Sequence, residues 1–147
     1  MKGKLITRNT DYAVRALCFM AINGKEIISV DKLVKELKIP RPFLRKIMQA
    51  LNKKGILQSY KGQGGGFTLS VPAEKIFLTD LITTFQGPLK LNECIFKKNI
   101  CHNVNNCSLK NKIDTLEKYI ISQLKSISVA SLSEENNKIL KKEGIPL

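Results

Sequence analysis

The sequence predicts a mostly α-helical protein with one small β-hairpin and a long helix near its carboxyl end. Three observations predict this fold class. Apolar residues recur at helical spacing along most of the chain, two short strand-like runs flank a glycine-rich segment at 61–66, and a heptad-like apolar repeat fills 108–132. The 147 residues suit one domain with an appended arm, and a hydrophobic content of 43% supplies a packed core.

The first helix is predicted over 9–22, where alanine, leucine and methionine residues follow helical spacing. Asn9 or Thr10 is the expected N-cap, because a short polar side chain can accept from the first backbone N–H groups of a helix. Cys18 lies within the apolar pattern. We therefore expect Cys18 to be a small core residue rather than a metal ligand.

Two further helices follow at close spacing. Ser29 is expected to cap a helix over 30–37, and a third helix begins at about Pro40 or Arg41 and runs to Lys53. Two helices joined by a turn of a few residues, the second with basic residues on its outer face, form the helix-turn-helix pattern. The predicted inner face of the third helix comprises Phe43, Leu44, Ile47, Met48 and Leu51.

A hairpin is predicted next, with strands over 56–60 and 67–71. The loop between them is basic at Lys61 and rich in glycine, so it can turn sharply and approach another backbone closely. A hairpin of this kind directly after the third helix is typical of a wing, and 1–86 is therefore predicted to be a winged helix-turn-helix domain. The loop leads into a strand and lacks the lysine of a Walker sequence, which argues against nucleotide binding.

The charge of the chain favours a polyanionic partner. The net charge is +13, and nine basic residues but two acidic ones, Asp31 and Glu36, lie within 31–61. Such an excess suits nucleic acid or an anionic membrane surface, although a merely lysine-rich soluble protein remains an alternative. The sequence has no apolar run long enough for a membrane helix and no signal peptide at its start, so we expect a cytoplasmic protein without a membrane partner.

The carboxyl-terminal part is predicted to form a long helix over 108–132. Its apolar residues recur in steps of three and four, close to a heptad repeat, and the helix would be roughly 35 Å long. A helix of this length in a small chain is expected to pack against a symmetric partner, the alternative being its own domain. The polar segment 133–147 is predicted to be a flexible tail. The repeat consists of Leu109, Ile113, Leu116, Ile120, Leu124 and Ile127.

The segment 87–107 has little periodicity and contains three cysteines, Cys94, Cys101 and Cys107. A local group of three thiols in a cytoplasmic chain indicates metal or redox chemistry, and thiolates bind iron–sulfur clusters, zinc or copper(I). The thiols are not in tight pairs, which favours a cluster over zinc. His102 is either a fourth ligand or an exposed residue without a role, and direct disulfide chemistry is a further alternative.

These features together resemble the Rrf2 family of winged-helix regulators, the group that includes IscR and NsrR. The resemblance extends from about residue 5 to 132 and is carried by 10–17, 39–47, the wing at 61–69 and the three-cysteine loop. It implies a homodimer joined by the long helix, with recognition helices and wings in the grooves of a palindromic DNA operator. It also implies one iron–sulfur cluster per subunit that senses redox state, nitric oxide or iron–sulfur status.

The fourth ligand divides that family. IscR-like members have a histidine three residues after the last cysteine, where this chain has Lys110. NsrR-like members use an aspartate from the first helix of the other subunit, and Asp11 matches that position. The resemblance therefore implies a [4Fe–4S] cluster held by Cys94, Cys101, Cys107 and Asp11. The alternatives are a [2Fe–2S] site with His102, a cluster-free regulator that senses through zinc, thiols, a small molecule or a partner, and a structural Asp11 at the helix dipole.

Candidate DNA contacts follow from the predicted fold. Lysine side chains supply phosphate contacts, whereas arginine can pair bidentately with guanine. Arg41 and Arg45, early in the third helix, are therefore the expected base-reading residues, and Gln63 beside Gly64 is expected to enter the minor groove. The expected phosphate contacts are Lys46, Lys53, Lys54 and Lys61. With one histidine and no acid–base pair or nucleotide loop, the sequence argues against an enzyme.

Overall fold

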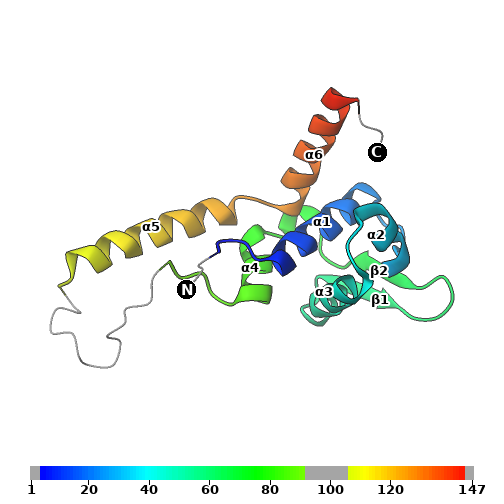
Figure 1. The fold of residues 1–147 in the computed structure, drawn as a ribbon, viewed down its shortest axis with the longest axis horizontal. Coiled ribbons are helices and arrows are strands. Elements are labelled where there is room, and N and C mark those ends of the chain that lie inside the picture. Colours follow the sequence, from blue (N-terminus) through cyan, green and yellow to red (C-terminus); the bar gives the residue numbers. More distant parts are fainter. Residues whose placement is uncertain (1–3, 92–105, 145–147) are drawn as a thin grey trace.

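The computed structural model describes residues 4–91 and 106–144. Its elements surround α1, and α5 extends away from the winged-helix part while α6 projects separately (Figure 1). This architecture confirms the predicted fold class. The elements are α1 (Arg8–Ile22), α2 (Val30–Leu37), α3 (Arg41–Lys53), β1 (Leu57–Tyr60), β2 (Gly66–Leu69), the 3₁₀ helix η1 (Ala73–Lys75), α4 (Leu78–Gln86), α5 (Ser108–Lys125) and α6 (Val129–Glu143).

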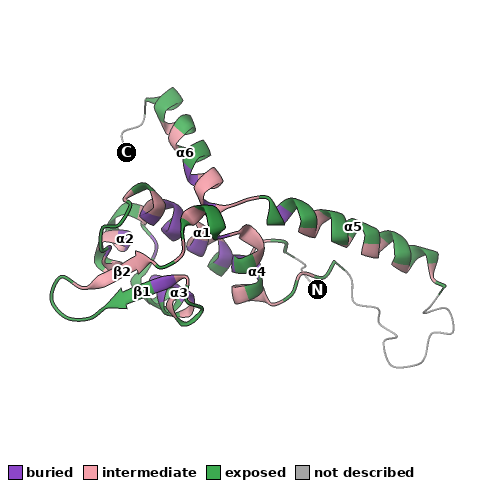
Figure 2. Ribbon diagram, turned by 180° about the vertical axis from the view of Figure 1, so that it is seen from behind, coloured by how far each residue is buried: buried purple, intermediate pink, exposed green. Residues whose placement is uncertain are grey.

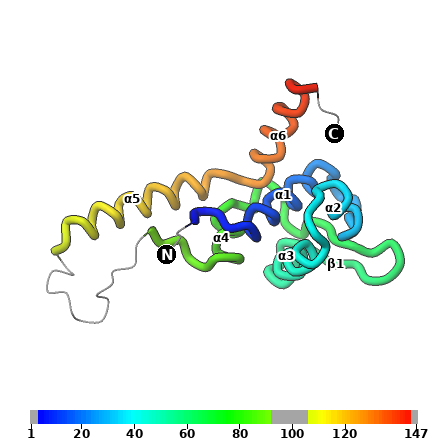
Figure 3. The backbone as a smooth tube through the Cα atoms, viewed as in Figure 1, coloured from blue at the N-terminus to red at the C-terminus, as the bar shows by residue number. Residues whose placement is uncertain are grey.

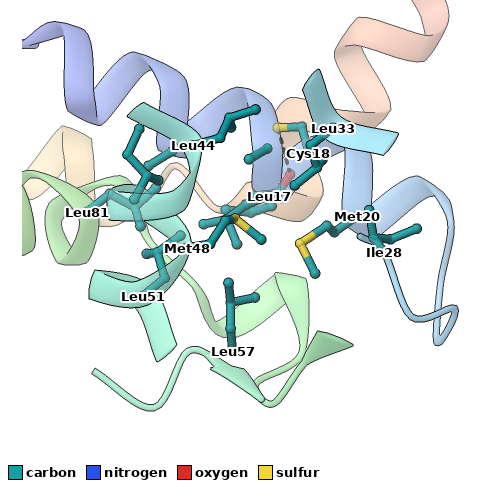
Figure 4. Close-up of a cluster of buried hydrophobic side chains, with 14 of the residues drawn as sticks. Leu17, Cys18, Met20, Ile28, Leu33, Leu44, Met48, Leu51, Leu57 and Leu81 are labelled. Carbon is teal, nitrogen blue, oxygen red and sulfur yellow. Dashed lines mark hydrogen bonds between the residues drawn. The ribbon is translucent and has the colours of Figure 1, made fainter. Parts of the chain in front are cut away.

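The central helix α1 contacts α2, α3, α4, α6 and β2. Its buried residues include Leu17, which lies among side chains from α3, α4 and β1 (Figure 4). The helix begins at Arg8, one residue before the predicted range, and its N-cap is Thr7 rather than Asn9 or Thr10. Thr10 is instead buried and its hydroxyl donates to Gln86 Oε1 at 2.7 Å, so the end of α4 fastens the start of α1.

The two helices of the helix-turn-helix, α2 and α3, begin and end at the predicted residues. Ser29 caps α2 by accepting from the backbone N–H of Lys32 at 3.1 Å, and Lys38 adopts a left-handed conformation in the turn that follows. The prediction that Phe43 belongs to the inner face of α3 is wrong, because Phe43 is 41% exposed. Its ring meets Tyr12 of α1 edge-on, with the ring centroids 6.1 Å apart. The other four predicted inner residues, Leu44, Ile47, Met48 and Leu51, are buried.

The hairpin is joined to the helix-turn-helix by its backbone. Strands β1 and β2 pair antiparallel, from Leu57 opposite Leu69 to Tyr60 opposite Gly66. Phe67 also exchanges two backbone hydrogen bonds of 2.9 Å with Ile28, just before α2. A Cβ on Gly66 would overlap the backbone of Ile28, so glycine permits this close approach.

The carboxyl-terminal prediction is corrected by the structure. The single helix expected over 108–132 is two helices, and the segment expected to be a flexible tail belongs largely to α6. The backbone turns between them (Figure 3) because Ile127 O accepts from Leu78 N at 2.9 Å and Val129 N donates to Ile76 O at 2.8 Å. Ser128 then caps α6 by accepting from Ser131 N at 3.1 Å.

Cys18 is a core residue, as predicted. It is 4% exposed, and its Sγ lies 3.9 Å from the carbonyl oxygen of Val129, the first residue of α6 (Figure 4). Burial raises the pKa of the Cys18 thiol to about 11, because desolvation penalises the thiolate. The thiol is therefore neutral at physiological pH and ionises only as the pH rises towards 11.

This burial predicts slow alkylation of Cys18. At pH 8 the folded protein should react with iodoacetamide at Cys18 about a hundredfold more slowly than the urea-unfolded chain, since the thiolate is the nucleophile. Peptide mapping by mass spectrometry over time would measure both rates. Equal rates in the folded and unfolded chain would show that Cys18 is accessible and that its place in the core is wrong.

Candidate nucleic-acid interface

An open groove of about 480 Å³ lies between the helix-turn-helix and the hairpin. One wall is formed by the start of α2 and the exposed face of α3, and the other by the hairpin. The two walls are held together by the Ile28–Phe67 backbone bridge. The polar side chains that line the groove are Ser29, Asp31, Arg41, Arg45, Gln49, Asn52, Ser59, Tyr60 and Lys61.

Helix α3 presents one polar face to this groove. Arg41, Arg45, Gln49 and Asn52 follow one another in steps of four, four and three, so they lie on one side of the helix. The opposite side carries the buried residues that pack on the core. Arg41 is the first residue of α3, and the amino-terminal residues of a recognition helix are those that meet base edges in helix-turn-helix complexes.

The structure brings some of the predicted DNA-contacting residues together. Arg41, Arg45 and Lys61 line the groove. Lys46 and Lys53 are exposed on α3 outside it, and Lys54 follows directly. Gln63 and Gly64 are exposed in the hairpin loop, where Gly62 and Gly64 have φ angles of 91° and 75° that favour glycine.

Six polar residues of the groove were not predicted as DNA contacts from the sequence, and three of them, Asp31, Gln49 and Asn52, belong to α2 and α3. Gln49 and Asn52 continue the spacing set by Arg41 and Arg45, and amide side chains can pair with adenine. Extending that spacing along the helix would have found both residues. Asp31 of α2 forms an ion pair with Arg41, a contact between two helices that no local spacing rule predicts.

The proposed cluster ligands are only partly within the described residues. Cys94, Cys101 and His102 lie outside them. Cys107 is the half-buried N-cap of α5, and its Sγ accepts from the backbone N–H of Lys110 at 3.4 Å. Within 4–91 and 106–144, no three His, Cys, Asp or Glu side chains gather in a way that suits a metal ion.

Asp11 lies far from Cys107 within one chain. It belongs to the first turn of α1, whereas the amino-terminal end of α5 points away from the rest of the molecule (Figure 1). Asp11 Oδ2 pairs with Arg15 Nε at 3.0 Å. The hollow around Asp11 is otherwise basic, because it is lined by Lys4, Arg8, Arg15 and Lys38.

Part of the apolar stripe of α5 is uncovered in the single chain, where Ile113, Ile120 and, just after the helix, Ile127 are half-buried. Leu109, Leu116 and Tyr119 are 67%, 53% and 63% exposed, and Leu124 near the carboxyl end is the buried residue of the helix. Figure 2 shows the helix as mainly exposed along its length. Packing of the whole stripe on its own domain is therefore excluded. No helix of the described residues combines the length and apolarity needed to cross a membrane.

Solved structures of similar proteins have the same fold as this chain. CymR of B. subtilis, the global cysteine regulator, superposes with a TM-score of 0.73 over 90% of this chain and 98% of its own, at 17% identity. IscR of T. potens superposes with a TM-score of 0.67 over 91% of this chain and 89% of its own, at 22% identity. At these identities the likeness concerns the fold alone.

The sequence comparisons identify the family. Residues 6–135 match the Rrf2 family, described as an iron-dependent transcriptional regulator. A protein of Aquifex aeolicus described as an HTH-type transcriptional regulator is 34% identical over 123 residues, which cover 82% of this chain and 85% of the relative. These are transcriptional regulators and not enzymes. The chain therefore belongs to the Rrf2 family of transcriptional regulators.

Proposed function

We propose that this chain is a homodimeric regulator that binds a palindromic operator and responds to a signal through its cysteines. The observation that carries this function is the groove between α3 and the hairpin, in which Arg41, Arg45 and Lys61 converge. A helix fits the major groove of B-DNA, and a hairpin beside it reaches the adjacent backbone or minor groove. The net charge of +13 supports the same partner.

The two parts of this surface have different tasks. Arg41 and Arg45 offer planar guanidinium groups that can donate two hydrogen bonds to one guanine. The exposed Lys46, Lys53 and Lys61 are suited to phosphate, which a point charge contacts without sequence preference. Binding affinity then depends mainly on the lysines, and the choice of DNA sequence depends mainly on the arginines.

The uncovered stripe of α5 supports a homodimer. Leu109, Leu116 and Tyr119 together expose an apolar surface on α5. Exposed apolar patches of this kind often mark protein–protein contact sites. A second α5 packed against this stripe removes apolar area from water on both chains. A two-fold axis at α5 would give the dimer two α3 helices related by symmetry, and the two half-sites of a palindromic operator require two such helices.

We propose that the sensing site is a cluster held by Cys94, Cys101 and Cys107 with Asp11 of the second chain as fourth ligand. The donor chemistry fits, since thiolates bind iron–sulfur clusters and a carboxylate can complete the set. The separation of Asp11 from the start of α5 within one chain favours donation across the dimer. A bound cluster would supply a redox- and nitric-oxide-sensitive link. A [4Fe–4S] form is favoured and a [2Fe–2S] form with His102 is the alternative.

Asp11 must then exchange partners. In the single chain its carboxylate pairs with Arg15, and cluster ligation would take the carboxylate from that pair. Lys4, Arg8 and Lys38 form no ion pair with the residues that the structure describes, so the freed Arg15 would be a further cation without an acidic partner in the same hollow. The charge of this side of the helix-turn-helix therefore depends on whether Asp11 is a ligand.

A cluster-free thiol regulator is the second candidate. Its support is the likeness to the cysteine regulator CymR, including the Staphylococcus aureus protein solved in an oxidised form, with a TM-score of 0.68 over 89% of this chain and 97% of its own. Here the cysteines of 94–107 would react directly, by forming disulfides or other reversible oxidation products. Metal analysis separates the two candidates.

The first prediction concerns base reading. Arg45→Ala should reduce the preference for one base pair of the operator by about 1–3 kcal/mol, because a bidentate contact to guanine is lost. Lys53→Ala is the control, since it removes one cation outside the groove and should weaken all duplexes alike. Binding to single-base operator variants by fluorescence anisotropy would measure both. Uniform weakening by Arg45→Ala would mean that Arg45 contacts phosphate only.

The second prediction concerns assembly. Leu116→Lys should convert the dimer to a monomer, because it places a charge in the centre of the proposed α5 interface. Ser122→Lys introduces the same side chain on the opposite face of α5 and should leave the dimer intact. Sedimentation velocity would give the masses, and a monomeric wild-type chain would refute the dimer.

The third prediction concerns the cluster. The anaerobically purified protein should contain about four iron and four sulfide per chain. Asp11→Ala and Cys107→Ala should lower both, whereas Cys18→Ala, which removes a buried thiol, should not. Iron, sulfide and zinc assays with visible absorption would measure the outcome. Either zinc or no metal would refute the cluster; absence of metal would favour the thiol regulator, and zinc would favour a zinc site.

A further inference from the structure

The groove contains one acidic side chain, and it is paired with an arginine of the recognition helix. Asp31 is the second residue of α2, and Arg41 is the first residue of α3. Their atoms Oδ1 and Nη2 form an ion pair, and both residues line the groove. Within the described part of the chain Arg45, one turn further along α3, has no ion pair. The two groove arginines are therefore held differently.

Stability does not account for Asp31. The side chains of Asp31 and Arg41 are 67% and 55% exposed, and ion pairs as exposed as this contribute little to folding. The start of α2 is already capped by Ser29, and a carboxylate in the first turn adds only a small favourable interaction with the helix dipole. A carboxylate in a groove that faces DNA repels phosphate and lowers the general affinity for nucleic acid.

We propose that Asp31 is a specificity-determining residue that orients Arg41 for reading a base. An arginine without a partner can turn to the nearest phosphate, where it carries no sequence information. With Oδ1 held at Nη2, the remaining guanidinium hydrogens can still donate to the O6 and N7 atoms of guanine. The nearby carboxylate also repels phosphate from this position. Asp31 thus lowers general affinity and raises the preference for the correct sequence.

This inference rests on the proposed sequence-specific DNA binding, and it predicts effects of opposite sign. Asp31→Asn removes the repulsion, so a duplex of mixed sequence should bind more tightly. It also releases Arg41, so the ratio of the affinity for the preferred duplex to the affinity for the mixed duplex should fall. A mere change in net charge would raise both affinities by the same factor.

The chain offers a matched control for charge. Glu26 forms an exposed ion pair with Lys32, with Lys32 Nζ 3.2 Å from Glu26 Oε1, and neither residue lines the groove. Glu26→Gln therefore makes the same change in net charge without touching Arg41. Arg41→Lys is a second test, because the ammonium group keeps the charge but cannot form the bidentate contact.

The experiment uses the full chain and DNA of known sequence. The wild type first selects duplexes from a randomised library. The most enriched duplex and a mixed-sequence duplex of equal length are then titrated at one salt concentration with the wild type, Asp31→Asn, Glu26→Gln and Arg41→Lys. For Asp31→Asn we expect tighter binding of the mixed duplex and a ratio of the two affinities lower by about fivefold or more. Arg41→Lys should lower the ratio similarly, and Glu26→Gln should leave it unchanged.

Two results would overturn the inference. If Asp31→Asn changes both affinities by the same factor as Glu26→Gln does, then Asp31 acts through net charge and does not orient Arg41. If Arg41→Lys keeps the wild-type ratio, then Arg41 does not read a base. Failure of the proposed function would be seen separately, because a wild type that enriches no duplex fails before any variant is compared, and the inference then fails with it.

Discussion

The contact between the hairpin and the segment before α2 is the constraint on which the DNA-facing surface depends. The two backbone hydrogen bonds between Ile28 and Phe67 set the distance between the walls of the groove. They form because Gly66 has no Cβ that would overlap the Ile28 backbone. Without this approach the hairpin would be a two-stranded ribbon of marginal stability. With it, Lys61 stands opposite Arg41 and Arg45 across one groove.

A second backbone bridge has the same role at the other end of the molecule. The pairing of Phe77 with Ser128 interrupts the carboxyl-terminal helix, so that α5 lies beside α4 and α6 lies beside α1 and η1. From there a contact route runs from α5 to α4, from α4 to α1 and from α1 to α3. Because α1 is packed tightly along this route, a shift of α5 on ligation or oxidation would move the recognition helix as part of a rigid body.

The sequence predicts those parts of this fold that local chemistry determines. The cap at Ser29, the start of α3 and the hairpin loop follow from capping, proline and glycine preferences that act over a few residues. The break after Lys125 and the exposure of Phe43 depend on pairing with 76–78 and on Tyr12, which lie far away in the sequence. The apolar heptad-like repeat extends to Ile127, but α5 ends at Lys125 because the following residues pair with the backbone of 76–78.

The same distinction applies to the site. Helical spacing placed Arg41 and Arg45 on one face of α3, whereas the ion pair to Asp31 requires the turn at Lys38 to bring α2 and α3 together. Because of that turn, Asp31 of α2 lies beside Arg41 on the face of α3 that lines the groove. The chain carries a large positive charge, which by itself gives strong attraction to DNA of any sequence. Discrimination between DNA sequences has to come from other interactions. A carboxylate that lowers affinity while restraining an arginine is therefore consistent with selection for sequence choice rather than for tight binding.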